Sequence, residues 1–183
     1  VGMGFVAALV LLERSQNVPP ALAVTPASPA DYVGAKLVTF AVLTVAGGLA
    51  IALVAWWPPS AALLLRMTAA LSCTGVLAVL GGVVMVSSAH SLNHLIARSI
   101  PVSLVVYAPL LAHFGVVEGW LAWGLFGLSP GHAMLRALLW AAEPSAVTPL
   151  ELVYAFGYMG LLSAFLFRWA LKLHTRTIGY AGS

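Results

Sequence analysis

Two groups of residues in this chain have the spacing of chemically active sites. Gly127-Leu128-Ser129-Pro130-Gly131 fits the G-x-S-x-G pattern, in which a sharp turn exposes a nucleophilic serine. His90 and His94 are one helical turn apart, which is the spacing of two zinc ligands on a helix. Each group can react only if the surrounding elements supply its missing partners.

The sequence around both groups argues against catalysis. A nucleophile elbow needs a strand before the serine and a base in reach, whereas an apolar helical run precedes Ser129 and a proline follows it. We therefore interpret the motif as a turn. An intramembrane hydrolase centred on Ser129 is kept as an alternative function, after the two transport functions described below. No carboxylate or cysteine accompanies His90 and His94, so with Arg98 they indicate the basic end of a helix. His113 and His132 are interpreted as isolated interfacial residues.

Composition places the chain among membrane proteins. Hydrophobic residues make up 62% of it and charged residues only 7%, against about 25% charged in a typical globular domain. The eight lysines and arginines are scattered singly and form no patch that would suit a nucleic acid. Cys73 is the single cysteine, which excludes an internal disulfide framework and a CxxC metal motif.

The apolar segments predict an all-α, polytopic membrane helix bundle. A hydrocarbon core of about 30 Å needs roughly 20 apolar residues per helix. Residues 37–117 supply three such spans, the third over residues 100–117, and residues 148–167 supply a last one. Residues 1–12 are apolar but too short to span, so we expect them to be the end of a helix whose beginning precedes this sequence. We predict one transmembrane domain, residues 1–183, with a partial first helix and about four full spans.

A polar elbow, residues 13–36, separates the first two apolar segments. Its prolines predict a very short helix over residues 20–24, which Thr25-Pro26 ends because the residue before a proline avoids the helical region. Ser28 as N-cap and Asp31 three residues later then predict the start of a second helix that continues into the membrane.

The segment 118–147 predicts a different arrangement. Residues 120–128 and 132–142 are apolar or amphipathic pieces too short to span, so we expect two short helices that dip into the membrane or lie along its surface. Thr148 and Glu151 form a capping-box pattern that predicts the start of the last helix.

The basic residues fix the expected orientation. Arg66 and Arg136 lie on the side opposite the elbow, where Arg66 is interpreted as a helix-end anchor at the headgroups. Cytoplasmic loops carry the excess of Lys and Arg, so the elbow and the tail, residues 168–183, are expected in the cytoplasm. The elbow side carries six bases, namely Arg14, Lys36, Arg98, Arg168, Lys172 and Arg176.

The elbow also carries the residues of a family resemblance. It resembles the loop after the second helix of type-2 ABC export permeases, and most of all that of the fluoroquinolone export permeases of actinobacteria. The order of segments, with external short helices before a last span, is similar too. A complete subunit of that family has six helices, which implies that the first and part of the second precede this sequence. The matching residues are Glu13-Arg14, Ala21-Leu22, Val24-Thr25-Pro26, Tyr32 and Ala35-Lys36.

The resemblance implies a permease that performs no chemistry and binds no cofactor itself. A separate cytoplasmic ABC ATPase subunit would bind ATP and magnesium and contact the elbow, whose short helix would be the coupling helix. A second permease subunit, identical or related, would complete the route for a lipophilic drug or lipid-like substrate. The protein would be a multi-pass protein of the bacterial cytoplasmic membrane, surrounded by lipid, with a cytoplasmic C-terminus and an external pair of re-entrant helices.

The implied site residues fall into two sets. Ser103 and Tyr107 would line the substrate pathway. The alternative function is a secondary, ion-coupled transporter, although no acidic or basic residue is evident at mid-depth in the spans. Leu22 and Val24 would be apolar contacts with the ATPase, and Glu13, Arg14 and Lys36 would hold the elbow to neighbouring helix ends. The full set of elbow residues implied in coupling to the ATPase is Glu13, Arg14, Leu22, Val24, Thr25, Pro26, Tyr32 and Lys36.

Overall fold

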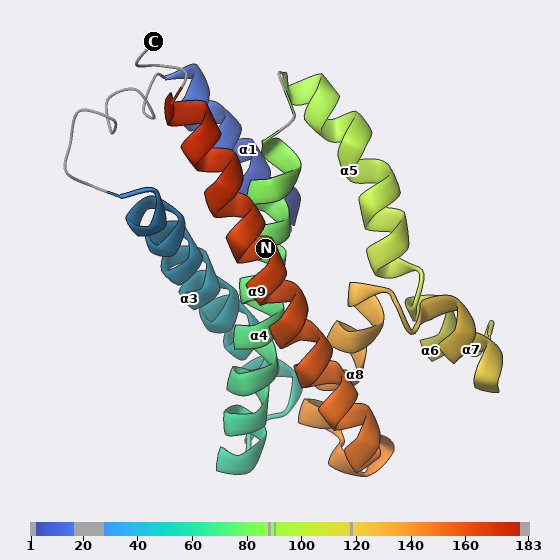
Figure 1. Cartoon of the computed structure of the whole chain (residues 1–183). Helices are drawn as coiled ribbons and strands as arrows, with labels where there is room; N and C mark the ends of the chain where they lie inside the picture. Colours follow the sequence, from blue (N-terminus) through green and yellow to red (C-terminus); the bar gives the residue numbers. More distant parts are fainter. Residues whose placement is uncertain (1–2, 17–27, 88, 90, 118, 180–183) are drawn as a thin grey trace.

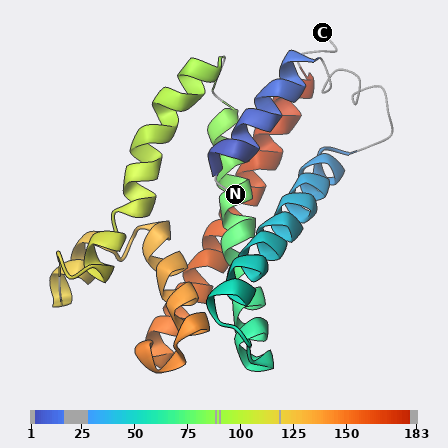
Figure 2. The same cartoon turned by 180° about the vertical axis from the view of Figure 1, so that it is seen from behind.

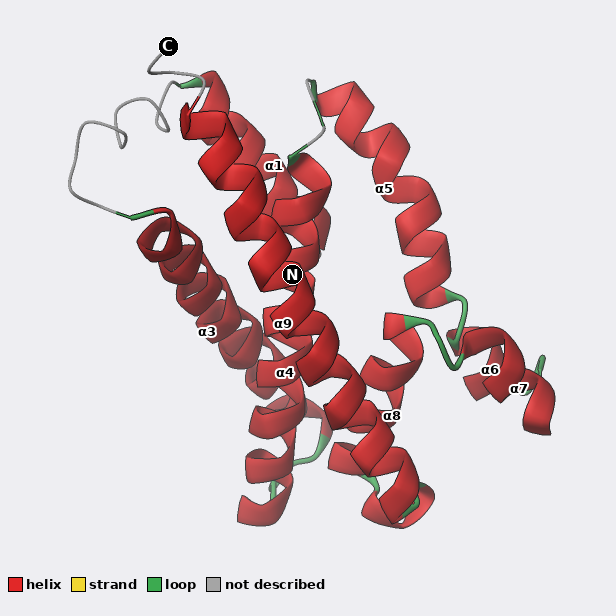
Figure 3. Cartoon of the chain, viewed as in Figure 1, coloured by secondary structure: helices red, strands yellow, loops and turns green. Residues whose placement is uncertain are grey.

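The chain folds into a bundle of helices (Figure 1). The computed structural model describes residues 3–16, 28–87, 89, 91–117 and 119–179. These residues contain helices, turns and loops but no strand (Figure 3), which confirms the all-α class for the described part. The elements in chain order are α1 (Met3–Ser15), α3 (Pro29–Ala55), α4 (Ala61–Val86), α5 (Leu92–Tyr107), α6 (Leu110–His113), α7 (Gly119–Phe126), α8 (Pro130–Ala142), a 3-10 turn (Pro144–Ala146) and α9 (Pro149–Gly179).

Four helical stretches are long and apolar enough to cross a membrane. They are Ala30–Ala55, Ala61–Val86, Leu92–His113 and Pro149–Leu173, of 26, 26, 22 and 25 residues. At about 1.5 Å per residue the three longer stretches reach about 38 Å, enough for the hydrocarbon core, while Leu92–His113 is divided between α5 and α6. Met3–Glu13 is a shorter apolar helix. The prediction of about four helices long and apolar enough to cross a membrane is therefore confirmed.

Helix α4 forms the centre of the bundle. It packs against α1, α3, α8 and α9, as the two opposite views show (Figures 1 and 2). In its most apolar window 39% of the residues are buried, compared with 11% in each of the other three spans. The outer helices α3, α5 and α9 therefore present most of their apolar surface outward, as membrane-exposed helices do.

Small residues let α8 and α1 approach the centre closely. Ala133, Ala137 and Ala141 lie one turn apart on α8 and have no exposed surface, because they pack in the core around Met67 of α4 and Met159 of α9. Close packing through small side chains is the usual way in which helices associate inside membranes.

The contact between α1 and α4 depends on Gly82. A β-carbon at this position would lie 2.6 Å from the carbonyl oxygen of Met3 and 3.1 Å from the β-carbon of Val6. Such distances leave no space for a side chain, so α1 can lie here only because the residue is glycine. Val6 and Ala7 are accordingly buried between the two helices.

Both predicted capping boxes are present. The hydroxyl of Ser28 accepts from the Asp31 amide at 3.2 Å, and the Ser28 amide donates to the Asp31 carboxylate at 2.8 Å. At α9 the Thr148 hydroxyl accepts from the Glu151 amide at 3.3 Å, and the Thr148 amide donates to the Glu151 carboxylate at 2.8 Å. Each box satisfies two amide groups at a helix start that would otherwise lack partners.

Several helix ends differ from the expected positions. The third span begins at Leu92 instead of near residue 100, because Ser91 caps it by accepting from the His94 amide at 3.2 Å. Helix α9 continues beyond residue 167 to Gly179, since neither proline nor glycine interrupts residues 161–178. The predicted short helix over residues 20–24 lies outside the described residues.

The segment between α5 and α9 contains the two expected short helices. Helix α7 lies with α6 beside the end of α5, while α8 runs alongside α4 and α9 (Figure 1). The turn that joins α7 to α8 is residues 127–129, so the helices stop and start where the G-x-S-x-G motif lies.

Candidate functional site

The described ends of the polar elbow are joined by a cluster of three residues. Lys36 Nζ donates to Glu13 Oε1 at 2.5 Å, and the Tyr32 hydroxyl donates to Glu13 Oε2 at 2.7 Å. Lys36 Nζ also lies 4.8 Å from the centre of the Tyr32 ring. We call Glu13, Tyr32 and Lys36 the elbow clasp. Both carboxylate oxygens of Glu13 are used, so the end of α1 is bound to the first two turns of α3.

The elbow clasp is partly shielded from solvent. The side chain of Lys36 is 11% exposed and that of Glu13 is 29% exposed. Charge-assisted hydrogen bonds of this kind contribute more than exposed ion pairs, which are worth about 0–1 kcal/mol. Loss of either partner would also leave the other charge half-buried without its counterion. We therefore expect the clasp to hold two helix ends that are 23 residues apart in sequence.

Local structure explains how α3 presents its two clasp residues. Tyr32 and Lys36 are four residues apart and so lie on one face of the helix. The capping box at Ser28 fixes where that helix begins. On an adjacent face, Val33 is 2% exposed and packs with Leu80 of α4 and Ala170 of α9. The start of α3 is thus held against the bundle while Tyr32 and Lys36 reach Glu13.

The other predicted elbow residues cannot be placed in the same way. Leu22, Val24, Thr25 and Pro26 lie outside the described residues, and Arg14 is in α1 with its side chain outside them. The structure therefore brings together three of the eight residues that the sequence nominated.

The two predicted pathway residues lie on the outer surface of this single chain. Ser103 and Tyr107 are exposed on α5, Tyr107 to 60%. The residues of α5 that face the bundle include Val102 and Val106, which with Leu166 of α9 line an apolar cavity of about 450 Å³. Pathway lining by Ser103 and Tyr107 stays a prediction that concerns the surface between two subunits.

Ser129 is part of the turn that joins α7 to α8. Its hydroxyl donates to the carbonyl oxygen of Val105 at 2.7 Å and accepts from the Gly131 amide at 3.2 Å, so it caps α8. The residue is only 7% exposed. At Gly131 a β-carbon would lie 1.7 Å from the Val106 carbonyl oxygen, which requires glycine here. The G-x-S-x-G residues therefore form the close contact between the start of α8 and the end of α5.

The same turn is bonded to α9. Tyr154 donates to the Gly127 carbonyl oxygen and Tyr158 donates to that of Leu128, each at 2.6 Å. The two tyrosines are one helical turn apart on α9, so both side chains lie on the face of that helix next to the turn. Three side-chain hydrogen bonds thus fix the α7–α8 turn between α5 and α9.

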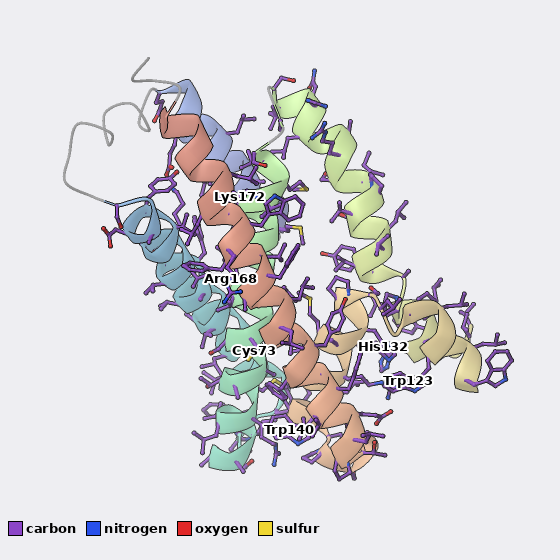
Figure 4. All side chains as sticks on the ribbon, in the orientation of Figure 1. Cys73, Trp123, His132, Trp140, Arg168 and Lys172 are labelled. Atoms are coloured by element: carbon purple, nitrogen blue, oxygen red, sulfur yellow. The ribbon has the colours of Figure 1, made fainter. Side chains whose placement is uncertain are left out.

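A second group of polar residues was not recognised from the sequence. His132 and Arg136 lie one turn apart on α8, and Arg136 Nη1 is 3.4 Å from Glu151 Oε1 of α9. The Trp123 ring lies 4.8 Å from the His132 ring and 5.5 Å from the Arg136 guanidinium, and Figure 4 shows Trp123 beside His132. The available signal was the four-residue spacing of His132 and Arg136 on an amphipathic helix.

His132 is buried among other side chains, which corrects the interpretation of this residue as an isolated one. It is 1% exposed, and neither ring nitrogen has a hydrogen-bond partner among the described residues. Burial lowers the pKa of His132, the charge of Arg136 lowers it further, and the carboxylate of Glu151 opposes both effects. The neutral ring is therefore favoured.

The described residues contain no group of three or more potential metal ligands. Comparison with protein-family models, with curated proteins and with solved structures gives no match.

Proposed function

We propose that this chain is the membrane-spanning permease subunit of an ATP-driven ABC exporter. It would move a lipophilic drug or lipid-like molecule across the bacterial cytoplasmic membrane, while a separate subunit binds ATP and magnesium and hydrolyses the nucleotide. The observation that carries the proposal is the elbow clasp. Because Glu13 binds both Tyr32 and Lys36, a force applied to the elbow reaches α1 and α3 together.

The packing of α1 and α3 supports a mechanical role. Both helices lie against α4, α1 through Gly82 and α3 through Val33. A displacement of the elbow would therefore move a unit that includes the central helix. Helix α5 packs less extensively, because Leu95 is its one buried residue whereas α3 buries Val33, Phe40 and Ala52, so α5 is the element best able to change its position relative to that unit.

The arrangement of helix ends supports the proposed orientation. The end of α1 and the starts of α3 and α5 lie at the same end of the bundle as the end of α9 (Figure 1). In the proposal this end faces the cytoplasm and receives the ATPase at the coupling helix, residues 20–24. Helices α7 and α8 would be the external re-entrant pair. A second permease subunit would face α5, with Ser103 and Tyr107 beside the pathway.

Association with an ATPase is the first test. The full-length protein is expressed with its chromosomal neighbours, purified in mild detergent and analysed by mass spectrometry. We expect an ATPase with a phosphate-binding loop to co-purify. The double variant Leu22→Asp with Val24→Asp should lose it, because charges would replace the apolar contacts. The matched control is Ala21→Ser with Ala23→Ser, which should keep the complex. An intact complex in the aspartate variant would contradict the proposal.

The energy source distinguishes the alternative. An ATP-driven exporter stops when ATP is depleted while the proton gradient is maintained. An ion-coupled secondary transporter continues under those conditions and stops when the gradient is collapsed by a protonophore. Transport of a lipophilic dye from cells under the two treatments would therefore separate the two functions.

A further inference from the structure

Helices α6, α7 and α8 surround a cavity of about 360 Å³, and the ionisable residues that line it in the described part of the chain, His113, His132 and Arg136, are basic. No acidic side chain lines it among the described residues. The lining combines polar and apolar groups, as small-molecule sites commonly do. The lining residues that matter below are His113, Trp123, His132, Leu135, Arg136 and Leu139.

Two of these side chains contain nitrogens that make no hydrogen bond to the described residues. Both ring nitrogens of His132 and Nε of Arg136 are buried and have no hydrogen-bond partner among the described residues. Buried polar groups are nearly always paired, because an unpaired one costs about 1–3 kcal/mol. The two residues occupy successive turns of α8, and both line the cavity. A single acceptor group in the cavity could satisfy both side chains.

The charges of Arg136 and His132 determine which kind of hydrogen-bond acceptor the cavity can bind. Arg136 remains protonated at every relevant pH. Its Nη1 group is bound to Glu151, which leaves Nε for a ligand. His132 is favoured in its neutral form by burial, which lowers its pKa, so it can donate one hydrogen bond without adding a second charge. This pattern of donors suits an oxyanion better than a cation or a neutral amide.

The other lining residues and the cavity volume limit the size and shape of a ligand. Trp123 stands against His132 and Arg136 at ring distances of 4.8 and 5.5 Å, so the three side chains are already ordered. Leu135 and Leu139 supply apolar surface beside them. The volume is near the lower end of the roughly 300–1,000 Å³ found for ligand pockets, which fits one or two rings.

We propose that this cavity binds the oxyanion, carboxylate or phosphate, of a small amphipathic molecule. Arg136 and His132 hold the oxyanion, while Trp123 and Leu139 contact the apolar part. The source of the oxyanion is either a soluble aromatic carboxylate or the headgroup of an anionic lipid. The site does not depend on an ATPase partner, so its test is independent of the proposed function.

The test uses purified full-length protein in a neutral detergent. Equilibrium binding of 2-naphthoate is compared with that of its neutral analogue 2-naphthamide, and binding of phosphatidylglycerol with that of phosphatidylcholine. We expect the anion of at least one pair to bind about tenfold or more tightly than its partner. Preference in the first pair identifies a soluble carboxylate and preference in the second a lipid headgroup. Absence of preference in both pairs overturns the proposal.

Three variants assign the site. His132→Phe keeps a planar ring but removes both nitrogens, and Arg136→Gln removes the cation. Each should weaken binding of the preferred anion by about tenfold or more. Glu151→Gln is the matched control, because it breaks the same ion pair but leaves both donors, and it should bind equally or more tightly.

Two results would overturn the assignment. One is unchanged affinity in His132→Phe, a variant that decides the question even if Arg136→Gln does not fold. The other is a loss in Glu151→Gln as large as that in Arg136→Gln, which would indicate a purely structural role for the ion pair. Melting temperatures of all variants in the same detergent separate weakened binding from general destabilisation.

Discussion

Nε of Arg66 donates a hydrogen bond to the carbonyl oxygen of Ala141, 3.3 Å away. Ala141 lies in the last turn of α8, where carbonyl groups have no partner within the helix. The positive charge also interacts favourably with the negative end of the helix dipole. Arg66 thus joins the central helix α4 to the end of α8, a contact that its interpretation as a headgroup anchor did not include.

Replacement of Arg66 by methionine should therefore destabilise the protein. Loss of the hydrogen bond and of the charge at the helix end is expected to cost about 1–2 kcal/mol. The measurement is the midpoint of thermal unfolding in detergent. Leu65→Ala, at a neighbouring residue that is 73% exposed, serves as the control and should change the midpoint little. Equal midpoints for the two variants would show that the contact with Ala141 contributes nothing.

Disruption of the elbow clasp should separate ATP hydrolysis from transport. In Glu13→Gln and in Lys36→Met the ion pair is lost, so motion of the elbow would reach α1 and α3 less efficiently. In the proposed complex with an ATPase subunit, we expect ATP hydrolysis to persist and transport per ATP to fall by about tenfold, equivalent to about 1.4 kcal/mol of coupling. Both activities are measured in proteoliposomes.

The reversed pair provides the control for the clasp. Glu13→Lys combined with Lys36→Glu restores opposite charges across the two helix ends and should recover part of the lost coupling. A double-mutant cycle gives the interaction energy of the pair. If the single variants transport as efficiently as the original protein, the clasp plays no part in coupling.

Substitution of Gly82 by alanine should weaken the contact between α1 and α4. The added methyl group would lie 2.6 Å from the Met3 carbonyl oxygen, which forces the helices apart at an expected cost of about 1–3 kcal/mol. Gly47→Ala is a matched control in α3, since nothing lies within 4 Å of its β-carbon position. There the higher helix propensity of alanine should leave stability unchanged or raise it by up to about 1 kcal/mol. The order of the two melting temperatures is the critical observation.

Acidification should destabilise the protein through His132. Its pKa is lowered in the folded state from the ordinary value of 6.5, so the unfolded chain binds the proton more readily. Stability contributed by the neutral ring is present above about pH 6.5 and is lost as the pH falls toward the folded-state pKa. The melting temperature should therefore decrease between about pH 7.5 and about pH 5.5.

Charged and polar groups surround His132, so a variant must isolate its contribution. Arg136 lies on the same helix, Glu151 and Tyr154 approach from α9, and His113 lies across the cavity. His132→Phe removes only the titration of the ring at residue 132. We expect a smaller decrease in this variant, and an identical decrease would assign the effect to another group.

Features determined by neighbouring residues could be predicted from the sequence. The starts of α3 and α9 were located through Ser28 and Thr148, because a capping box involves residues only three apart. The four spans followed from the length of the apolar runs. Helix ends without a strong local signal were less accurate: α9 passes residue 167 because nothing in its sequence stops it.

Features that join distant segments were predicted only in part. Family resemblance nominated Glu13, Tyr32 and Lys36, but the sequence alone gave no reason for Glu13 to meet residues 19 and 23 positions further on. The burial of His132 was missed because it results from packing against Trp123 of α7 and Tyr154 of α9. Periodicity within α8 carries no information about which helices cover it.

The hydrogen bonds from Tyr154 and Tyr158 have a consequence for biosynthesis. Their acceptors, Gly127 and Leu128, leave the ribosome 27 and 30 residues before their donors. Helices α7 and α8 are each too short to be inserted as an ordinary span, and two carbonyl groups of their turn gain these partners only when α9 arrives. The turn therefore takes its final form only after translation of α9 has begun.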